Sequence, residues 1–294
     1  MGKLIRFGPA GWDYPDWRGK VYPAQKPKGF DPLGYLAGYF DAVEINSTFY
    51  RPATAKVAQS WARRIAGHDK FQFTAKLWRR FTHERETAWS GDDVDAVRAG
   101  FDVLAEAGKL GAVVLQFPWS FRNSDPNREW LRDLLRAFAK YPLVVEVRHV
   151  SWNETDFYRE LAESKAGVVN VDQPLFRNSL RPSARATSSV GYIRVHGRNY
   201  QNWFRKDAGR DERYDYLYSA KELEPWAERA RALASEALVK EVYVVNNNHF
   251  AGQAVTNAAM LQAQVTGERV KVPPTLLAAY PKELRSIAAE DQLR

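Results

Sequence analysis

The sequence predicts an α/β protein built as a single (β/α)8 TIM-type barrel, and three observations support this prediction. Eight short apolar runs recur along the chain, and amphipathic, helix-like stretches separate most of them. This alternation is typical of parallel strands joined by crossover helices. The length of 294 residues also fits one such barrel, which typically uses roughly 250 residues.

The individual elements follow from local patterns. The predicted strands are the apolar runs that begin at Leu4, Ala42, Phe71, Gly111, Leu143, Gly167, Gly191 and Glu241. Helical periodicity predicts helices over residues 31–40, 54–66, 92–107, 127–140, 156–165, 221–237 and 252–266. Residues 173–189 have no helical period, so we expect one crossover helix after the sixth strand to be missing or irregular. The chain is predicted as one domain, 1–294, whose tail from about residue 270 contains Pro273-Pro274 and one final helix.

The composition excludes several kinds of chemistry. The chain contains no cysteine, which rules out disulfides, thiolate metal sites and cysteine nucleophiles. No signal-peptide pattern is visible and no apolar run is long enough to cross a membrane. We therefore expect a cytoplasmic protein without a membrane partner. The net charge of +8 favours anionic partners in general.

Polar residues share one face of most predicted strands. Side chains alternate across a strand, so residues two apart lie on the same face. In chain order the polar faces carry Glu44, Asn46 and Thr48; Thr74 and Lys76; Gln116; Glu146 and Arg148; Asn170 and Asp172; Arg194, His196 and Arg198; and Asn246 and Asn248. The opposite faces are apolar and suit the outer helices. We therefore expect the polar faces to point into the barrel, toward the C-terminal strand ends where active sites form.

The predicted barrel interior carries more positive than negative charge. The carboxylates and cations are Glu44, Glu146 and Asp172 against Lys76, Arg148, Arg194 and Arg198. Barrel interiors are normally filled by branched apolar residues, and an aliphatic filling is often at least as stable as buried charge. An excess of cations fits an anionic ligand, such as a phosphate or carboxylate held by arginine forks. It fits a self-neutralising structural network equally well.

Histidines gather near the same strand ends. Four of the five, His83, His149, His196 and His249, fall at or just after predicted strands. His149 and His196, with Glu44, Glu146 and Asp172, are candidate acid–base groups. The same groups could bind a divalent metal. No tight spacing such as H-E-x-x-H occurs, so no metal ligand is assigned and the cofactor stays open.

A long loop over residues 197–219 interleaves aromatic and basic residues, among them Trp203 and Tyr216. Aromatic stacking combined with backbone neutralisation is how proteins grip single-stranded nucleic acid, and sugars are also held on aromatic faces. A lid whose aromatic residues only pack on the barrel rim would give the same pattern.

The sequence resembles the YecE-like family, known as domain of unknown function family 72. The matching segments are GPAGWDYPDWRGKVYP, FDAVEINSTFYRPA, FTAKLWRRFTH, LQFPWSF, VVEVRHVSW, YIRVHGRNYQNW and NNNHFAGQAVTNA. They run from the first strand to the last. The resemblance implies a TIM barrel whose fold is similar to that of metal-dependent apurinic endonucleases and sugar isomerases. It implies no particular reaction.

Three functions are compatible with these observations. The first is an enzyme acting on a phosphate-bearing or nucleic-acid-derived anion. Its anion would be held by Lys76, Arg148, Arg194 and Arg198, with Glu44 or Glu146 as base and His149 or His196 as acid. Asn46, Gln116, Trp203, Tyr216, Asn246 and Asn248 complete the predicted binding set.

The second function is a non-catalytic nucleic-acid-binding protein that uses the long loop and the basic surface. The third is a glycoside hydrolase built on Glu44 and Glu146. The number of arginines argues against the third, because an oxocarbenium-like transition state is not stabilised by neighbouring cations.

Overall fold

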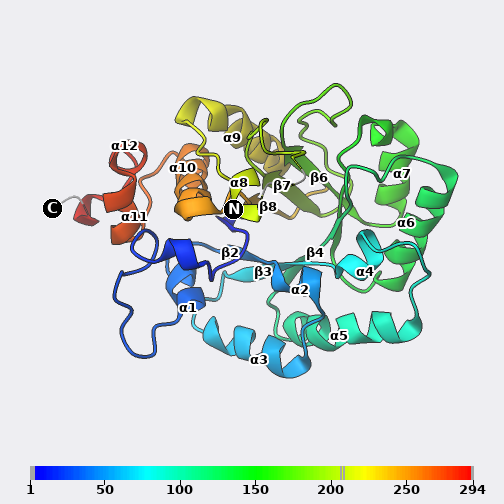
Figure 1. Ribbon diagram of the computed structural model, residues 1–294, viewed down its shortest axis with the longest axis horizontal. Helices are drawn as coiled ribbons and strands as arrows, with labels where there is room; N and C mark the ends of the chain where they lie inside the picture. Colours follow the sequence, from blue (N-terminus) through cyan, green and yellow to red (C-terminus); the bar gives the residue numbers. More distant parts are fainter. Residues whose placement is uncertain (1–3, 206, 208, 293–294) are drawn as a thin grey trace.

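The computed structural model describes residues 4–205, 207 and 209–292, and its centre is one eight-stranded parallel sheet that curves into a barrel (Figure 1). The strands are β1 (Leu4–Pro9), β2 (Ala42–Ile45), β3 (Gln72–Lys76), β4 (Leu110–Gln116), β5 (Leu143–Glu146), β6 (Gly167–Asp172), β7 (Val190–Val195) and β8 (Glu241–Asn246). Neighbours are hydrogen-bonded in the order β1-β8-β7-β6-β5-β4-β3-β2. The predicted (β/α)8 barrel is confirmed.

The barrel is nearly closed where β1 approaches β2. Ala10 and Glu44 form a parallel bridge there, and the Gly11 amide donates to the Glu44 carbonyl oxygen over 2.8 Å. Gly8 makes this approach possible, because a Cβ at that position would lie only 1.7 Å from the Ala42 carbonyl oxygen. A side chain at Gly8 would therefore push the two strands apart.

The predicted crossover helices are present with small changes at their ends. They are α1 (Pro32–Ala37), α3 (Ala55–Arg64), α5 (Gly91–Glu106), α6 (Asp125–Ala137), α7 (Thr155–Glu163), α9 (Ala220–Ser235) and α10 (Gln253–Thr266). Capping boxes fix where two of them begin: Ser90 with Asp93 at α5, and Ser219 with Glu222 at α9. The apolar faces of these helices pack against the outer face of the sheet and form the main core.

The crossover helix after β6 is missing, as predicted. Residues 173–189, all of which are described, contain no helix. This segment instead crosses the end of β5, where the Leu180 amide donates to the Arg148 carbonyl oxygen over 2.8 Å. The pairing between β5 and β6 is correspondingly short and joins Val144 to Gly167 and Val145 to Val168.

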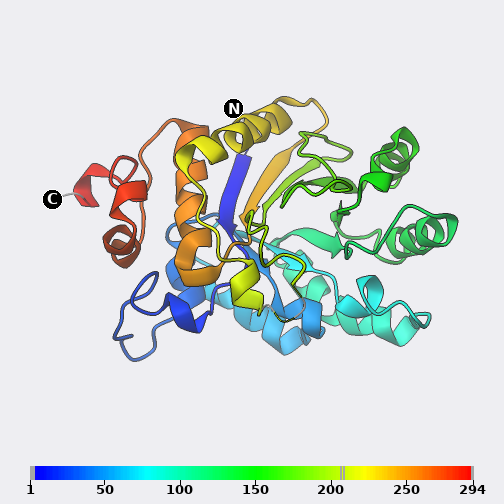
Figure 2. The ribbon, with the colours of Figure 1, turned by 45° about the horizontal axis from the view of Figure 1, so that its top comes forward.

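The prediction of one final helix in the tail is wrong. The tail forms two short helices, α11 (Pro274–Ala279) and α12 (Pro281–Leu284), and the 3-10 turn η4 (Glu290–Gln292). Pro281 has no amide hydrogen and disfavours helical geometry at the residue before it, so the helix breaks at Tyr280. The tail lies beside α10 and the loop after β1 (Figure 2). The Tyr280 hydroxyl fixes it there by donating to the Ala251 carbonyl oxygen over 2.8 Å.

Six short helical turns that the sequence did not predict follow the C-terminal ends of strands. They are η1 (Pro15–Trp17), α2 (Ser47–Tyr50), α4 (Arg79–Thr82), η2 (Val150–Trp152), α8 (Arg210–Arg213) and η3 (Phe250–Gly252). Turns of three or four residues are too short to show a helical period. They form the rim of the barrel mouth. Among the helices of the described residues, none has the length and apolar composition needed to span a bilayer.

Candidate functional site

The candidate site lies inside the barrel, toward the C-terminal strand ends. The interior contains a small apolar cluster of Ala10, Ala42, Ala112, Val114, Val144, Val169, Val171, Val190, Tyr192, Tyr243 and Val245. Polar side chains occupy the same inner face farther along the strands, among them Glu44, Gln116, Glu146 and Arg194. Apolar residues therefore fill part of the barrel interior, as expected, and charged residues lie toward the mouth.

Arg194 on β7 is the centre of this polar region. Its side chain has no exposed surface. The guanidinium binds both Glu44 carboxylate oxygens, with an Nε to Oε2 distance of 2.8 Å. Nη1 donates to Glu146 Oε2 over 2.7 Å and to Gln116 Oε1 over 3.1 Å. Burial lowers the pKa of Arg194, but Glu44 and Glu146 outweigh that effect and raise it above its ordinary value. Arg194 therefore connects β7 to three other strands, β2, β4 and β5.

Glu146 at the end of β5 connects Arg194 to the residues nearer the mouth. Its Oε1 accepts from Arg148 Nη2 over 2.8 Å and from His196 Nε2 over 3.0 Å. Burial by itself raises the pKa of Glu146, yet Arg194, His196 and Arg148 together hold it well below its usual range. Glu146 is thus an ionised carboxylate that positions its neighbours.

His196 is neutral in this arrangement. Burial, reinforced by Arg148 and Arg194, lowers its pKa to about 3 even though Glu146 acts in the opposite direction. Its Nδ1 lies 3.0 Å from the Asn247 side-chain amide. With that amide nitrogen as donor, Nδ1 accepts and Nε2 carries the proton donated to Glu146.

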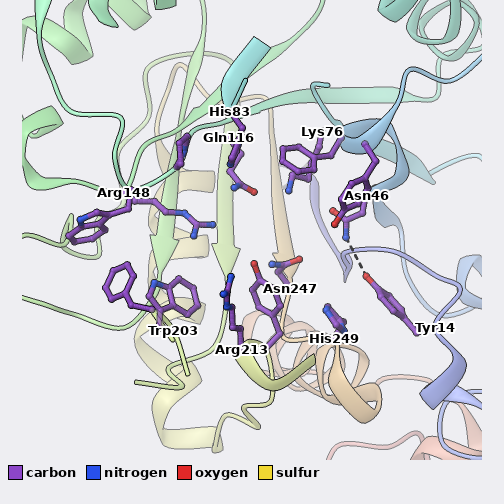
Figure 3. Close-up of a pocket in the computed structure, with 16 residues that line it drawn as sticks. Tyr14, Asn46, Lys76, His83, Gln116, Arg148, Trp203, Arg213, Asn247 and His249 are labelled. Atoms are coloured by element: carbon purple, nitrogen blue, oxygen red, sulfur yellow. Dashed lines mark hydrogen bonds between the residues drawn. The ribbon is translucent and has the colours of Figure 1, made fainter. Parts of the chain in front are cut away.

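A cavity of about 470 Å³ opens above this network (Figure 3). It is lined by Tyr14, Asn46, Phe49, Tyr50, Lys76, His83, Gln116, Pro118, Trp119, Arg148, Trp203, Phe204, Arg213, Tyr214, Asn247 and His249. Lys76, Arg148 and Arg213 approach it from different sides, whereas no aspartate or glutamate occurs among the described residues of its wall. The carboxylates lie beneath the floor, so the cavity itself presents positive charge.

Lys76 lies on the cavity wall beside an aromatic ring. Its Nζ lies 4.1 Å from the centre of the Phe49 ring. Within the described part of the chain, no carboxylate lies within ion-pair distance of it. Burial lowers the pKa of Lys76 to about 7, with Arg194 acting in the same direction and Glu44 and Glu146 opposing. His83 on the same wall is neutral, because burial and Lys76 lower its pKa to about 3.

Aromatic side chains form the outer part of the cavity. The Arg148 guanidinium lies 5.5 Å from the Trp203 ring centre. Trp119 and Phe204 contact each other edge to face, with 5.4 Å between ring centres. Phe204 is 51% exposed and Tyr50 is 57% exposed. Flat apolar surfaces therefore stand beside the cations.

Five of the residues predicted inside the barrel belong to its outer side. Asn170 donates to the Arg185 carbonyl oxygen in the segment after β6, and Asp172 accepts from Arg198 Nε over 2.9 Å. Asn248 donates to Asn257 on α10 over 2.8 Å. Asn246 lies on the same face of β8 as Asn248, and Val245 lies on the other face. The prediction that these faces point inward is wrong. On β6, valines occupy both alternating sets, so the pattern did not identify the inner face. Polar residues of α10 and of the loops cover the outer ends of β6 and β8.

Arg198 leaves the inner face because β7 ends at Val195. Gly197 follows with a φ of +95°, a left-handed conformation that side chains disfavour. The strand alternation therefore does not continue to Arg198, which pairs with Asp172 instead. Tyr218 completes this outer network by donating to the same carboxylate. Burial raises the pKa of Asp172, despite the opposing effect of Arg198.

Three other predicted residues have different roles from those expected. His149 is buried beside Trp119 and does not line the cavity; its Nδ1 accepts from the Ser151 amide over 3.2 Å. Tyr216 donates to Glu222 over 2.5 Å, away from the cavity wall. Thr48 is part of α2 and donates to the Lys76 carbonyl oxygen over 2.7 Å. Asn46, Lys76, Gln116, Arg148 and Trp203 do line the cavity.

The predicted catalytic and binding sets omitted several polar residues of the cavity wall, among them Tyr14, His83, Arg213, Asn247 and His249. Tyr14 stacks on His249 with 4.5 Å between ring centres. Asn247 could have been found from β8 parity, because Tyr243 and Val245 share its face. Arg213 lies in the long loop, where no sequence period indicates the direction of a side chain. Within residues 4–205, 207 and 209–292, no cluster of three or more His, Asp or Glu side chains could hold a metal ion.

Fold and site together define a TIM-barrel protein with a cationic cavity at the C-terminal mouth of its barrel. The chain belongs to the family described as Protein of unknown function DUF72, whose model matches residues 6–282. The family resemblance seen in the sequence is thereby confirmed.

Proteins that are similar to this chain in sequence or in structure support this assignment. The UPF0759 protein YunF of Bacillus subtilis is 28% identical over 271 residues, which cover 88% of this chain and 93% of YunF. A crystal structure of a DUF72 family protein from Thermotoga maritima is 33% identical, with a TM-score of 0.75 over 88% of this chain and 97% of that one. A DUF72 family protein from Enterococcus faecalis, 24% identical, has the same fold, with a TM-score of 0.76 over 90% of this chain and 96% of that one.

Proposed function

We propose that this protein is an enzyme acting on a small anionic substrate, phosphate-bearing or derived from nucleic acid, in the cavity at the barrel mouth. The observation that carries the proposal is the composition of the wall. Arg148 and Arg213 line it together with Lys76, whose pKa burial lowers to about 7, while the described part of the wall contains no carboxylate. Cations held in a partly desolvated cleft attract anions and stabilise developing negative charge.

Arg148 is the main anion-binding residue in this proposal. Its Nε and Nη2 both donate to Glu146 Oε1, over 3.0 Å and 2.8 Å. These contacts fix the guanidinium plane and leave Nη1 available for a ligand. A pre-positioned guanidinium binds a phosphate with less loss of side-chain freedom than an unsupported one. Glu44, Glu146 and Arg194 act here as positioning residues, because none of them lines the cavity.

The proton-transfer role falls to a group that lines the cavity and titrates near neutral pH. Lys76 meets both conditions. Glu44, Glu146 and His196, which the sequence suggested, lie in the network below, and Asp172 lies on the outer side of the sheet. Glycoside hydrolysis loses its basis for the same reason, since Glu44 and Glu146 both bind Arg194 rather than flanking a space for a sugar.

The test is calorimetric titration with inorganic phosphate and with a panel of sugar and nucleoside phosphates. The Arg148→Gln variant should bind at least about tenfold more weakly, as expected for the loss of one charge-assisted contact. Arg198→Gln is the matched control, because Arg198 also pairs with a buried carboxylate but does not line the cavity. Equal binding by wild type and Arg148→Gln would contradict the proposal.

A second candidate, non-catalytic binding of single-stranded nucleic acid, is favoured by one observation. Phe176, Tyr200 and Phe204 form a ring cluster beside the mouth, and the latter two are about half exposed. In that case an oligonucleotide should bind much more tightly than a mononucleotide, with a steep salt dependence. Phe204→Ala should then weaken oligonucleotide binding, whereas Tyr216→Ala should not, because Tyr216 is engaged with Glu222.

A further inference from the structure

Lys76 combines three features that an anion-binding role alone does not explain. It is the last residue of β3, and the Thr48 hydroxyl fixes its carbonyl oxygen over 2.7 Å. The residue is partly buried, and its Nζ reaches the cavity wall above the Phe49 ring. No described carboxylate forms an ion pair with it. A lysine that anchors phosphate needs a stable ammonium, and this environment disfavours one.

The charged and titratable groups around Lys76 come from several elements. They are Glu44 on β2, Glu146 on β5, Arg148 after β5, Arg194 on β7 and His83 after α4. Both carboxylates are already bound by Arg194, so they attract the ammonium only weakly. Burial lowers the pKa of Lys76 to about 7, and the two arginines add to that effect. Attraction to the Phe49 ring opposes this lowering but is weaker than the desolvation of an ammonium.

We propose that the Lys76 amine forms an imine with a ligand that carries an aldehyde or ketone group together with an anionic group. The anionic part of this ligand rests on the proposed function. The carbonyl would reach Nζ while the anion meets Arg148 or Arg213 across the same cavity. Neutral lysines in desolvated or cationic surroundings are the ones that use this chemistry.

The reaction needs no oxidant or reductant. The nitrogen lone pair attacks the carbonyl carbon, an N–C bond forms, and the carbonyl oxygen takes a proton to give a carbinolamine. The nitrogen then loses its remaining proton as the hydroxyl leaves as water, which yields the imine. Hydrolysis reverses both steps and returns the free amine. The imine nitrogen, once protonated, withdraws electrons from the ligand and acidifies the adjacent C–H bond.

The first experiment uses a neutral probe, so that it does not depend on anion binding. Wild-type protein is treated at pH 7 with formaldehyde and cyanoborohydride, and the methylation of each lysine is followed by peptide mass mapping. Burial lowers the pKa of Lys76 to about 7, against about 10.4 for an ordinary lysine, so at pH 7 a far larger fraction of Lys76 than of an ordinary lysine is the free amine. Allowing for its restricted access, Lys76 should react at least about tenfold faster than the exposed Lys56. Modification of Lys76 at or below the rate of Lys56 would overturn the proposal.

The second experiment adds the anionic group. Pyridoxal 5′-phosphate, followed by borohydride, should label Lys76 first, and inorganic phosphate should compete. Lys76→Arg should abolish this adduct, and Lys56→Arg should leave it unchanged. Arg148→Gln should slow labelling by pyridoxal phosphate but not by formaldehyde.

These outcomes separate the two proposals. Formaldehyde labelling of Lys76 without phosphate competition supports the reactive amine and contradicts the anion-binding function. Phosphate binding without preferential labelling supports the anion-binding function and overturns imine formation.

Discussion

Two buried ion networks lie on opposite sides of the same sheet. The inner network joins Glu44, Glu146, Arg148 and Arg194 inside the barrel. The outer network joins Asp172 and Arg198 with Tyr218, between the sheet and α9. The sequence places both sets at strand ends with the same residue types, yet the cavity at the barrel mouth is lined by Arg148 of the inner set and by no member of the outer set.

Their electrostatics differ in an equally clear way. Cations hold the pKa of Glu146 well below its usual range against the effect of burial, whereas burial prevails at Asp172 and raises its pKa. The two arginines of the inner network balance its two carboxylates, and Lys76 and Arg213, which have no carboxylate partner in the described part of the chain, line the adjoining cavity. Buried charge therefore indicates a binding site where cations without a carboxylate partner line an adjoining cavity. Where every charge is paired and no cavity adjoins, it indicates a structural contact that holds a loop or helix against the sheet.

The largest effect should come from removing the centre of the inner network. Arg194→Met leaves Glu44 and Glu146 buried without their main partner, which should lower the free energy of unfolding by about 3–5 kcal/mol. The matched Arg198→Met change should cost less, about 1–2 kcal/mol, because Arg198 is 28% exposed and Asp172 can take up a proton. Urea denaturation of both variants measures the difference. Equal losses would mean that the two networks are energetically alike.

A pH-dependent difference should distinguish Lys76 from surface lysines. Between pH 7 and about 10.4 the unfolded chain holds a proton at this lysine that the folded chain has lost. Stability therefore rises with pH across that window, and the penalty is fully present below pH 7. Relative to Lys76→Met, the wild type should gain up to about 1.4 kcal/mol per pH unit there. A flat difference in urea melts, like that expected for Lys56→Met, would contradict the pKa shift.

The outer network should respond in stability but not in binding. Tyr218→Phe removes a donor to Asp172 and an acceptor that the Gly197 amide uses over 2.8 Å. Leaving these buried groups short of a partner should cost about 1–3 kcal/mol. Phosphate binding, measured by calorimetry well below the melting temperature, should stay within about twofold of wild type. A large loss of affinity would show that the two networks are coupled through the sheet.

The sequence was sufficient to predict the fold because its evidence is repeated along the chain. Eight apolar runs and seven periodic helices each agree with one architecture, and the missing period over residues 173–189 correctly marked the absent helix. The short turns around the mouth and the break at Tyr280 could not be predicted, since three or four residues carry no measurable period.

The site was harder to predict because it depends on which alternating set of side chains points inward. On β7, Tyr192 and Arg194 define the inner set, but Gly197 turns the chain before Arg198. On β6, apolar residues occupy both sets, so Asn170 and Asp172 gave the wrong orientation. On β8, three asparagines follow one another, and only tertiary contacts select Asn247. The side-chain direction in such strands is set by what packs outside them.

The smallest effect on stability is expected in the long loop, which also tests most directly whether unpaired cations on the cavity wall bind the anion. Arg213 lines the cavity and, in the described part of the chain, has no carboxylate partner, whereas its neighbour Arg205 pairs with Glu212 over 2.8 Å and lies off the cavity wall. Arg213→Gln should change stability by less than about 0.5 kcal/mol, because a partly exposed cation stabilises little. It should weaken phosphate binding about three- to tenfold at low salt and less at high salt, as screening predicts. Arg205→Gln should leave binding unchanged. If both variants weaken binding equally, the general positive field of the loop attracts the anion, and the cavity wall has no special role.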